Sequence, residues 1–177
     1  MRDDVLRTIE RLYGKGDFQY TLAKYVDKQY WVSKIEDELE EVFVDNITDF
    51  SYSTCFSYFI QSSLNPKLRL GSDEFNDYLK KNFEIKGVMV LISVIAPYSV
   101  VKYVRYYYND GAVQLHEEYS PIDKETERFG KYILELLNKN GIENLDETVL
   151  NVEVPNISLE LKEEDVTIYN CLFEDSY

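Results

Sequence analysis

Apolar positions in the N-terminal third of the chain recur at steps of three and four, the spacing of an amphipathic helix. A first helix is expected to end at Gly14-Lys15-Gly16, since glycines interrupt helices. A second helical stretch runs from Asp17 through Phe43, as one long helix or as two joined near Gln29. The apolar positions that define the pattern are Val5, Leu6, Ile9, Leu12, Phe18, Leu22, Tyr25, Val26, Val32, Ile35, Leu39, Val42 and Phe43.

The middle of the chain changes to a period of two. Between Phe50 and Ile60, aromatic or β-branched residues alternate with small polar ones, which predicts a half-buried strand. Ser72 can cap a short helix that spans 73–83. The continuous run from Gly87 to Ile95 is rich in β-branched residues and predicts a central strand covered on both faces.

Residues 98–111 read YSVVKYVRYYYNDG, and AVQLHEEYS follows them. An Asp-Gly pair between two β-rich runs predicts a hairpin that turns at Asp110-Gly111. Cross-strand packing accounts for most of the tyrosines, because a tyrosine ring packs across neighbouring strands while its hydroxyl reaches water. One face of the first arm carries Tyr103, Arg105 and Tyr107, residue types that are enriched at interface hot spots. We expect a protein partner there if that face is exposed.

The last third begins with a helix from Lys124 to Asn140, which Gly141 is expected to end. Two runs of alternating apolar residues follow, at 148–154 and 166–173, and predict two closing strands. The fold class is therefore α+β, with a helical N-terminal third followed by a mixed, largely antiparallel sheet with two further helices. No repeat or linker divides the chain, so 1–177 is expected to be a single domain.

The net charge of the chain limits the kinds of molecule that it is expected to bind. Thirty-three acidic residues face 19 basic ones, which gives a formal charge of −14. Nucleic-acid affinity depends largely on Lys and Arg, and no basic cluster is longer than Lys80-Lys81, so nucleic-acid binding is not expected. An acidic surface is suited to steering a basic protein. The N-terminus lacks the apolar segment of a signal peptide and no run is long enough to span a membrane, so we expect a cytoplasmic protein without membrane contact.

Catalytic and cofactor motifs are weak throughout. His116 is the sole histidine, and Tyr119 and Ser120 follow where the HExxH zinc pattern needs a second one. We interpret His116 as a surface strand residue rather than a general base. Cys55 and Cys171 have no local nucleophile signature and are interpreted as small packing residues; a disulfide between them is possible but not implied. The sequence thus predicts a protein that is not an enzyme and uses no metal or cofactor.

The segment IEDELEE, at 35–41, is the most acidic part of the predicted helices. It has no interleaved lysine to form stabilising pairs, so its like charges repel. A solvated helix face is one interpretation, and a surface that uses its charge on a partner is the other. The candidate partner-binding residues are Glu36, Asp37, Glu40, Glu41, Tyr103, Arg105 and Tyr107.

This acidic helix, the aromatic hairpin YVRYYYNDGAVQLHEEY and the closing strands together resemble the small acidic immunity proteins encoded beside bacterial polymorphic or contact-dependent toxins. The resemblance implies a non-enzymatic inhibitor that binds a cognate toxin domain, with its carboxylates in a basic groove of that toxin. The alternative is a small-ligand or peptide-binding module whose pocket lies between the aromatic sheet and the helices. An enzyme that uses carboxylates alone ranks last, because no pair has a defensible spacing.

Overall fold

The computed structural model describes residues 1–23, 28–39, 41–82 and 84–174. The helices are α1 (Arg2–Ile9), the π-helical turn η1 (Glu10–Gly14), α2 (Gln19–Ala23), α3 (Lys28–Glu38), α4 (Asp73–Asn82), α5 (Lys124–Lys139), α6 (Glu147–Leu150) and α7 (Ile168–Leu172). The strands are β1 (Val42–Asn46), β2 (Cys55–Ser62), β3 (Glu84–Ser93), β4 (Tyr98–Asn109), β5 (Ala112–Glu118) and β6 (Glu143–Asn144).

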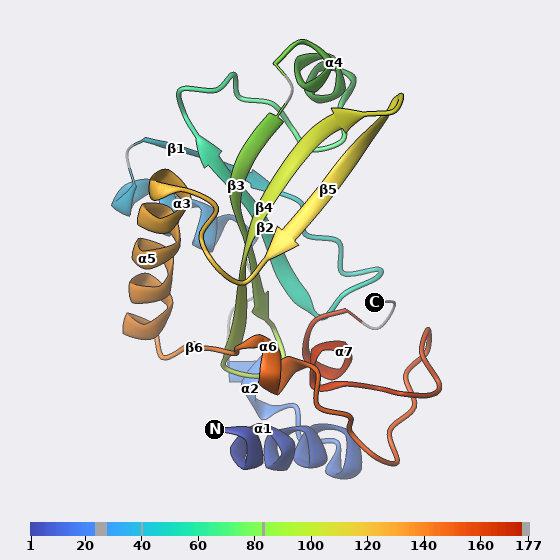
Figure 1. Ribbon diagram of the computed structural model, residues 1–177. Helices are drawn as coiled ribbons and strands as arrows, with labels where there is room; N and C mark the ends of the chain where they lie inside the picture. The colour runs from blue at the N-terminus through green and yellow to red at the C-terminus, as the bar shows by residue number, and fades with distance from the viewer. Residues whose placement is uncertain (24–27, 40, 83, 175–177) are drawn as a thin grey trace.

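One twisted sheet organises the molecule (Figure 1). Its strands run in the order β1-β2-β3-β4-β5 with every neighbouring pair antiparallel, while the short β6 pairs with β4 in parallel. The predicted α+β class with a mixed, largely antiparallel sheet is therefore confirmed. The hairpin is confirmed as well, because β4 and β5 turn at Asp110 and Gly111, whose φ values are 50° and 84°.

Helices cover both faces of this sheet and form two apolar cores. On one face, α3 and α5 contribute Trp31, Ile35, Phe129 and Ile133, which pack on β-strand side chains such as Val88. On the other face, α1, α4, α6 and α7 pack over the opposite side chains of the same strands, with α4 at one end in Figure 1 and the other three at the opposite end. The sheet is thus the partition between the two cores.

Strand β2 is more deeply buried than its alternating pattern predicts. Phe56, Tyr58 and Ile60 of β2 share one face as expected, but all eight residues of this strand are buried. The half-buried strand predicted here is therefore wrong, because helices cover its polar side as well. Residues 50–52 form a turn and Ser53 makes an isolated bridge with Glu174, so the strand begins only at Cys55. In β3 the prediction of a strand buried on both faces is confirmed.

The N-terminal third is less helical than predicted. The first helix does end at the expected glycines, with Gly16 at φ 65°. However, Val42 and Phe43 begin β1, which pairs with β2, instead of continuing a helix. Two or three apolar positions fit either period, so the available partner strand decides between them. Helices α2 and α3 stand on either side of 24–27, and the predicted junction near Gln29 falls within α3.

The two predicted closing strands are wrong, because α6 and α7 occupy much of these segments and only an isolated antiparallel bridge joins Glu153 to Thr167. Asp146 caps α6, since its side chain accepts a hydrogen bond from the Val149 amide at 3.0 Å. Thr167 and Asn170 exchange side-chain and backbone hydrogen bonds at the start of α7. All five residues of α7 are buried, so the helix shows no amphipathic period that the sequence could reveal. The helices after the N-terminal third are consequently four rather than two among the described residues.

The helices predicted after Ser72 and from Lys124 both form, as α4 and α5. Ser72 Oγ accepts a hydrogen bond from the Phe75 amide at 3.1 Å and caps α4. Asp123 Oδ1 accepts a hydrogen bond from the Thr126 amide at 2.9 Å and caps α5. Gly141 lies just beyond the end of α5 with φ 73°, a conformation that favours glycine. Asp123 also belongs to the candidate site.

Candidate functional site

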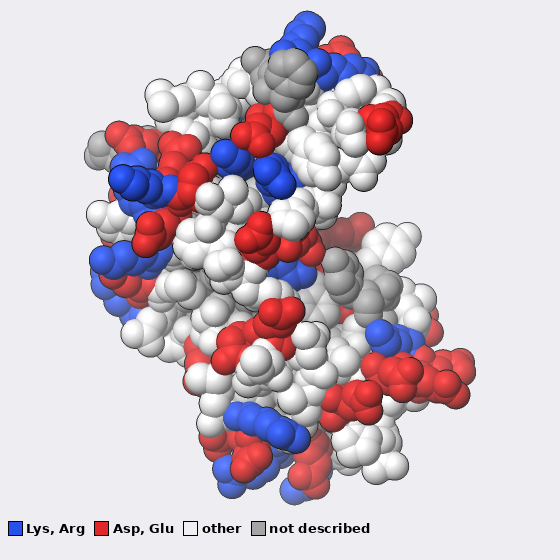
Figure 2. All heavy atoms as spheres, viewed as in Figure 1, with Lys and Arg blue, Asp and Glu red and all other residues white. Residues whose placement is uncertain are grey.

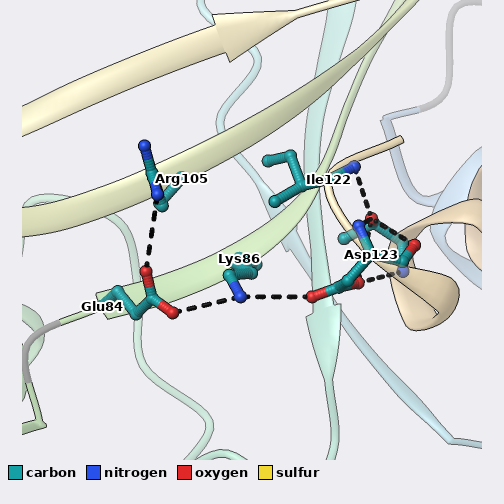
Figure 3. A network of polar contacts seen from close by, with 6 residues as sticks. Glu84, Lys86, Arg105, Ile122 and Asp123 are labelled. Carbon is teal, nitrogen blue, oxygen red and sulfur yellow. Dashed lines mark hydrogen bonds and ion pairs between the residues drawn. The ribbon is translucent and has the colours of Figure 1, made fainter. Parts of the chain in front are cut away.

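A polar network lies on the face of the sheet that α5 covers, beyond the N-terminal end of that helix (Figure 3). Lys86 Nζ is 3.1 Å from Glu84 Oε1 and 3.4 Å from Asp123 Oδ2, so the lysine bridges β3 and the helix cap. The other carboxylate oxygen of Glu84 lies 4.0 Å from Arg105 Nη1 on β4. Three elements are thus joined by side chains that are each partly exposed to solvent.

The charges of this network hold each other in the ionised state. The hydrogen bond to Glu84, together with Asp123, raises the pKa of Lys86. Partial burial opposes ionisation of Asp123, but its hydrogen bonds with Thr126 and Lys86 outweigh that effect and lower its pKa. Both shifts favour the charged forms, so Lys86 and Asp123 attract each other as ions near neutral pH.

The strand register extends this network into a surface. Arg105 stands opposite Lys86 on one side and His116 on the other. The Arg105 guanidinium lies 5.5 Å from the centre of the Tyr107 ring, and His116 Nε2 lies 2.6 Å from Glu118 Oε1. We call this surface the polar sheet face, and its residues are Glu84, Lys86, Arg105, Tyr107, His116, Glu118 and Asp123.

Tyr103 was predicted to share an exposed face with Arg105 and Tyr107, and only part of that prediction agrees with the structure. The three side chains do share one face of β4, but Tyr103 is 6% exposed and packs in the core beneath α5. Burial, with a contribution from Glu127, raises the pKa of its hydroxyl. Arg105 and Tyr107 remain partly exposed. Tyr103 therefore supports the fold, and only Arg105 and Tyr107 of the three are partly exposed to solvent.

The acidic residues near the end of α3 divide into two groups. Glu36, Asp37 and Glu38 are exposed and, among the described side chains, form no ion pair with a lysine or arginine. We call these three the α3 acidic surface. Glu41 differs because its carboxylate accepts a hydrogen bond from Arg128 Nη2 at 2.7 Å, which ties β1 to α5. Glu40 lies outside the described residues.

The first turns of α5 contact both the polar sheet face and the segment just after α3. Asp123 contacts Lys86 of the polar sheet face, and Arg128 contacts Glu41 just after α3. Figure 2 shows acidic and basic side chains interspersed over α5, while acidic ones gather over the loop 151–167 at the lower right. The N-terminal part of α5 thus lies against Lys86 through Asp123 and against Glu41 through Arg128.

Several contributors to this site were not predicted. No sequence motif marks Glu84, Lys86 or Asp123. Lys86 lies at one polar position of a strand, and nothing in its local sequence sets it apart. Their meeting depends on the register between β3 and β4 and on where α5 begins. The one available signal was Asp123 three residues before Thr126, a spacing typical of a helix N-terminus.

The two cysteine side chains lie away from the polar sheet face, in an apolar core. Cys55 and Cys171 are free thiols buried in one apolar core. Burial raises the pKa of each thiol to about 12, so neither forms a thiolate at neutral pH. Among the described residues, no group of three His, Cys, Asp or Glu side chains is arranged to hold a metal ion. Within the same residues, every helix is too short or too polar to cross a bilayer.

Surface cavities also occur away from the polar sheet face. One of about 570 Å³ lies between η1 and the loop after α6, and its lining includes Glu10, Tyr13 and Ile157. A second, of about 330 Å³, lies beside the exposed side chains of Tyr52 and Leu161. Neither lies between the sheet and the helices, where the alternative sequence-based interpretation placed a ligand pocket.

The chain matches no protein-family model, no curated protein and no solved structure. The polar sheet face and the α3 acidic surface are therefore the features that bear on function.

Proposed function

We propose that the protein is a non-enzymatic inhibitor that binds a basic protein partner, as immunity proteins bind the toxins they neutralise. The observation that carries this proposal is the α3 acidic surface. Glu36, Asp37 and Glu38 repel one another at adjacent positions and are not neutralised by a described lysine or arginine. Other acids of the chain are used internally, such as Asp123 with Lys86. Carboxylates kept unpaired at the surface are available to an external cation.

The charge of the whole chain supports the same function. A formal charge of −14 attracts a basic surface from a distance and accelerates association, an effect that salt weakens. Arg105 and Tyr107 lie on the neighbouring polar sheet face and provide residue types that often anchor interfaces. Acidic steering and aromatic anchoring are the two features expected of a tight inhibitor of a basic protein.

Growth of bacteria tests this function directly. The protein is co-produced with the product of the gene adjacent to its own, and growth is compared with cells that produce the neighbouring product alone. We expect the neighbour to arrest growth and the protein to restore it through a complex that co-purifies. A neighbour that is harmless, or that arrests growth equally in both strains without forming a complex, contradicts the proposal.

Charge variants then test which surface makes the contact. Replacing Glu36→Gln, Asp37→Asn and Glu38→Gln together should slow association roughly tenfold at low salt and much less at high salt, because steering is electrostatic. The matched control is Glu160→Gln, Glu163→Gln and Glu164→Gln, which removes the same charge from exposed positions of the loop 151–167. Equal slowing by both sets, measured by stopped flow, would show that the α3 acidic surface has no special role.

A further inference from the structure

The outer edge of β5 ends the sheet, and no described strand pairs with it. Residues 112–116 of this strand are exposed, and in Figure 1 the hairpin of β4 and β5 extends beyond α5. An edge strand presents unpaired backbone donors and acceptors to any extended chain that approaches it. Such an edge is a place where a partner can add a strand.

Turn geometry identifies the backbone groups that point outward. Asp110 and Gly111 both have positive φ, which defines a two-residue turn of type I′. In such a hairpin the flanking pair, Asn109 and Ala112, exchanges hydrogen bonds, and hydrogen-bonded pairs then alternate along the ladder. Gln114 and His116 therefore bond to β4, whereas the amides and carbonyls of Val113 and Leu115 point away from the sheet.

The strand at the opposite edge of the sheet, β1, is largely buried, whereas β5 is largely exposed. Asp45 of β1 is buried, and its Oδ2 accepts a hydrogen bond from the Leu70 amide at 2.6 Å. The loop between β2 and α4 thus packs on β1, and proteins commonly use a loop to cover an edge strand. Strand β5 carries no such cover among the described residues, and it contains neither proline nor lysine.

Side chains along β5 fit an added strand. Val113 is 36% exposed and Leu115 is 47% exposed, and both lie on the same face as their β4 partners Tyr108 and Tyr106. Two apolar side chains at alternate positions can pack against alternate side chains of an incoming strand. Acidic residues lie toward both ends of β5, with Asp110 in the turn and Glu118 at the last position.

We propose that β5 accepts an extended segment of a basic protein as an added strand, with hydrogen bonds at the outward groups of Val113 and Leu115. This inference rests on the proposed function and specifies how the partner is held. The charge of the chain favours a basic segment whose cations reach Asp110 and Glu118. It disfavours a second copy of this chain, because two copies would each carry −14.

Amide hydrogen exchange tests the added strand without the natural partner. The probe is the peptide acetyl-Lys-Val-Lys-Val-Lys-Val-Lys-amide, and the matched control replaces every lysine with glutamate. We expect the basic peptide to slow exchange of the Val113 and Leu115 amides by about tenfold, because they gain hydrogen bonds. The Gln114 and His116 amides, already bonded to β4, should change little. No slowing at Val113 and Leu115, or equal slowing by the acidic peptide, overturns the proposal.

Variants of Leu115 separate strand addition from folding. Leu115→Pro removes an outward amide, which an edge strand tolerates, and should abolish peptide-induced protection at Val113. If that variant does not fold, Leu115→Lys keeps the amide and the fold while repelling a basic segment, and it should weaken peptide binding at least severalfold. Leu115→Thr is the control that retains both the amide and neutrality. Protection that persists in the folded proline variant contradicts the proposal.

The same variants distinguish failure of this inference from failure of the proposed function. A folded Leu115→Pro protein that still restores growth shows that the partner binds without β5, and the inhibitory function stands. If the unaltered protein neutralises nothing, the function fails whatever the peptide does. Sedimentation equilibrium adds a further test, because a dimer that Leu115→Pro dissociates would show that β5 pairs with a second copy instead.

Discussion

Gly130 of α5 lies directly against the ring of Tyr103 in the core on that face of the sheet. A Cβ atom at this position would stand 2.7 Å from Tyr103 Cζ and closer still to the hydroxyl oxygen. The absence of a side chain therefore lets the helix approach the sheet closely enough to bury a tyrosine. This single contact removes Tyr103 from the surface and leaves Arg105 and Tyr107 as the exposed part of their strand face.

Gly130→Ala should lower stability even though alanine favours helices. The helical gain is about 1 kcal/mol, whereas overpacking a core costs about 1–3 kcal/mol. The difference leaves a net loss of about 1 kcal/mol, within a range of about 0–2 kcal/mol, which urea unfolding would measure. Glu135→Ala, on the exposed face of the same helix, is the control and should change stability little. A stabilised Gly130→Ala variant would mean that Tyr103 moves aside at little cost.

At the scale of elements, α5 holds the candidate surfaces together. Its N-cap Asp123 contacts Lys86, its first turns carry Arg128 toward Glu41, and its inner face packs on β3 and β4. The helix start thus determines where the polar sheet face ends and ties it to the segment just after α3. Loss of the cap should loosen both contacts together.

Asp123→Ala should destabilise the protein by about 1 kcal/mol, which is typical for the loss of a helix cap. Asp123→Asn is the control, since asparagine also caps helices but cannot attract Lys86. Because the folded-state pKa of Asp123 is lowered, its carboxylate stabilises the fold above its unfolded pKa of about 3.9. That contribution is lost as pH falls through the lower folded-state value. Urea unfolding should therefore show the wild-type protein to be more stable than Asp123→Asn at neutral pH. The stabilities of the two proteins should converge at acidic pH.

At the scale of the whole molecule, charge is the dominant property. Thirty-three acids and 19 bases cannot neutralise one another, so a formal charge of −14 remains however the chain folds. Self-repulsion of this kind weakens the compact state and is screened by salt. The acids of the loop 151–167 and of the α3 acidic surface contribute to this field at exposed positions.

Stability should therefore rise when salt increases from about 10 mM to about 300 mM sodium chloride, because the Debye length shortens to below the spacing of most surface charges. The loop variant Glu160→Gln, Glu163→Gln and Glu164→Gln changes the formal charge from −14 to −11 and should flatten this dependence. Thermal unfolding at each salt concentration measures both effects. A stability that falls with salt would instead show that ion pairs such as Lys86 with Glu84 outweigh the repulsion.

The sequence by itself determined the features that depend on neighbouring residues. Asp110-Gly111 required a turn, Ser72 and Gly141 bounded their helices, and the composition imposed the negative charge, because backbone sterics and charge counts need no distant partner. The tertiary structure alone decided the rest. Pairing with β2 made Val42 a strand residue, and burial of all sides of α7 left its sequence without a helical pattern. The close approach of α5 hid Tyr103, and strand register placed Lys86 beside Arg105. These outcomes depend on contacts between residues far apart in sequence, where local periodicity carries little information.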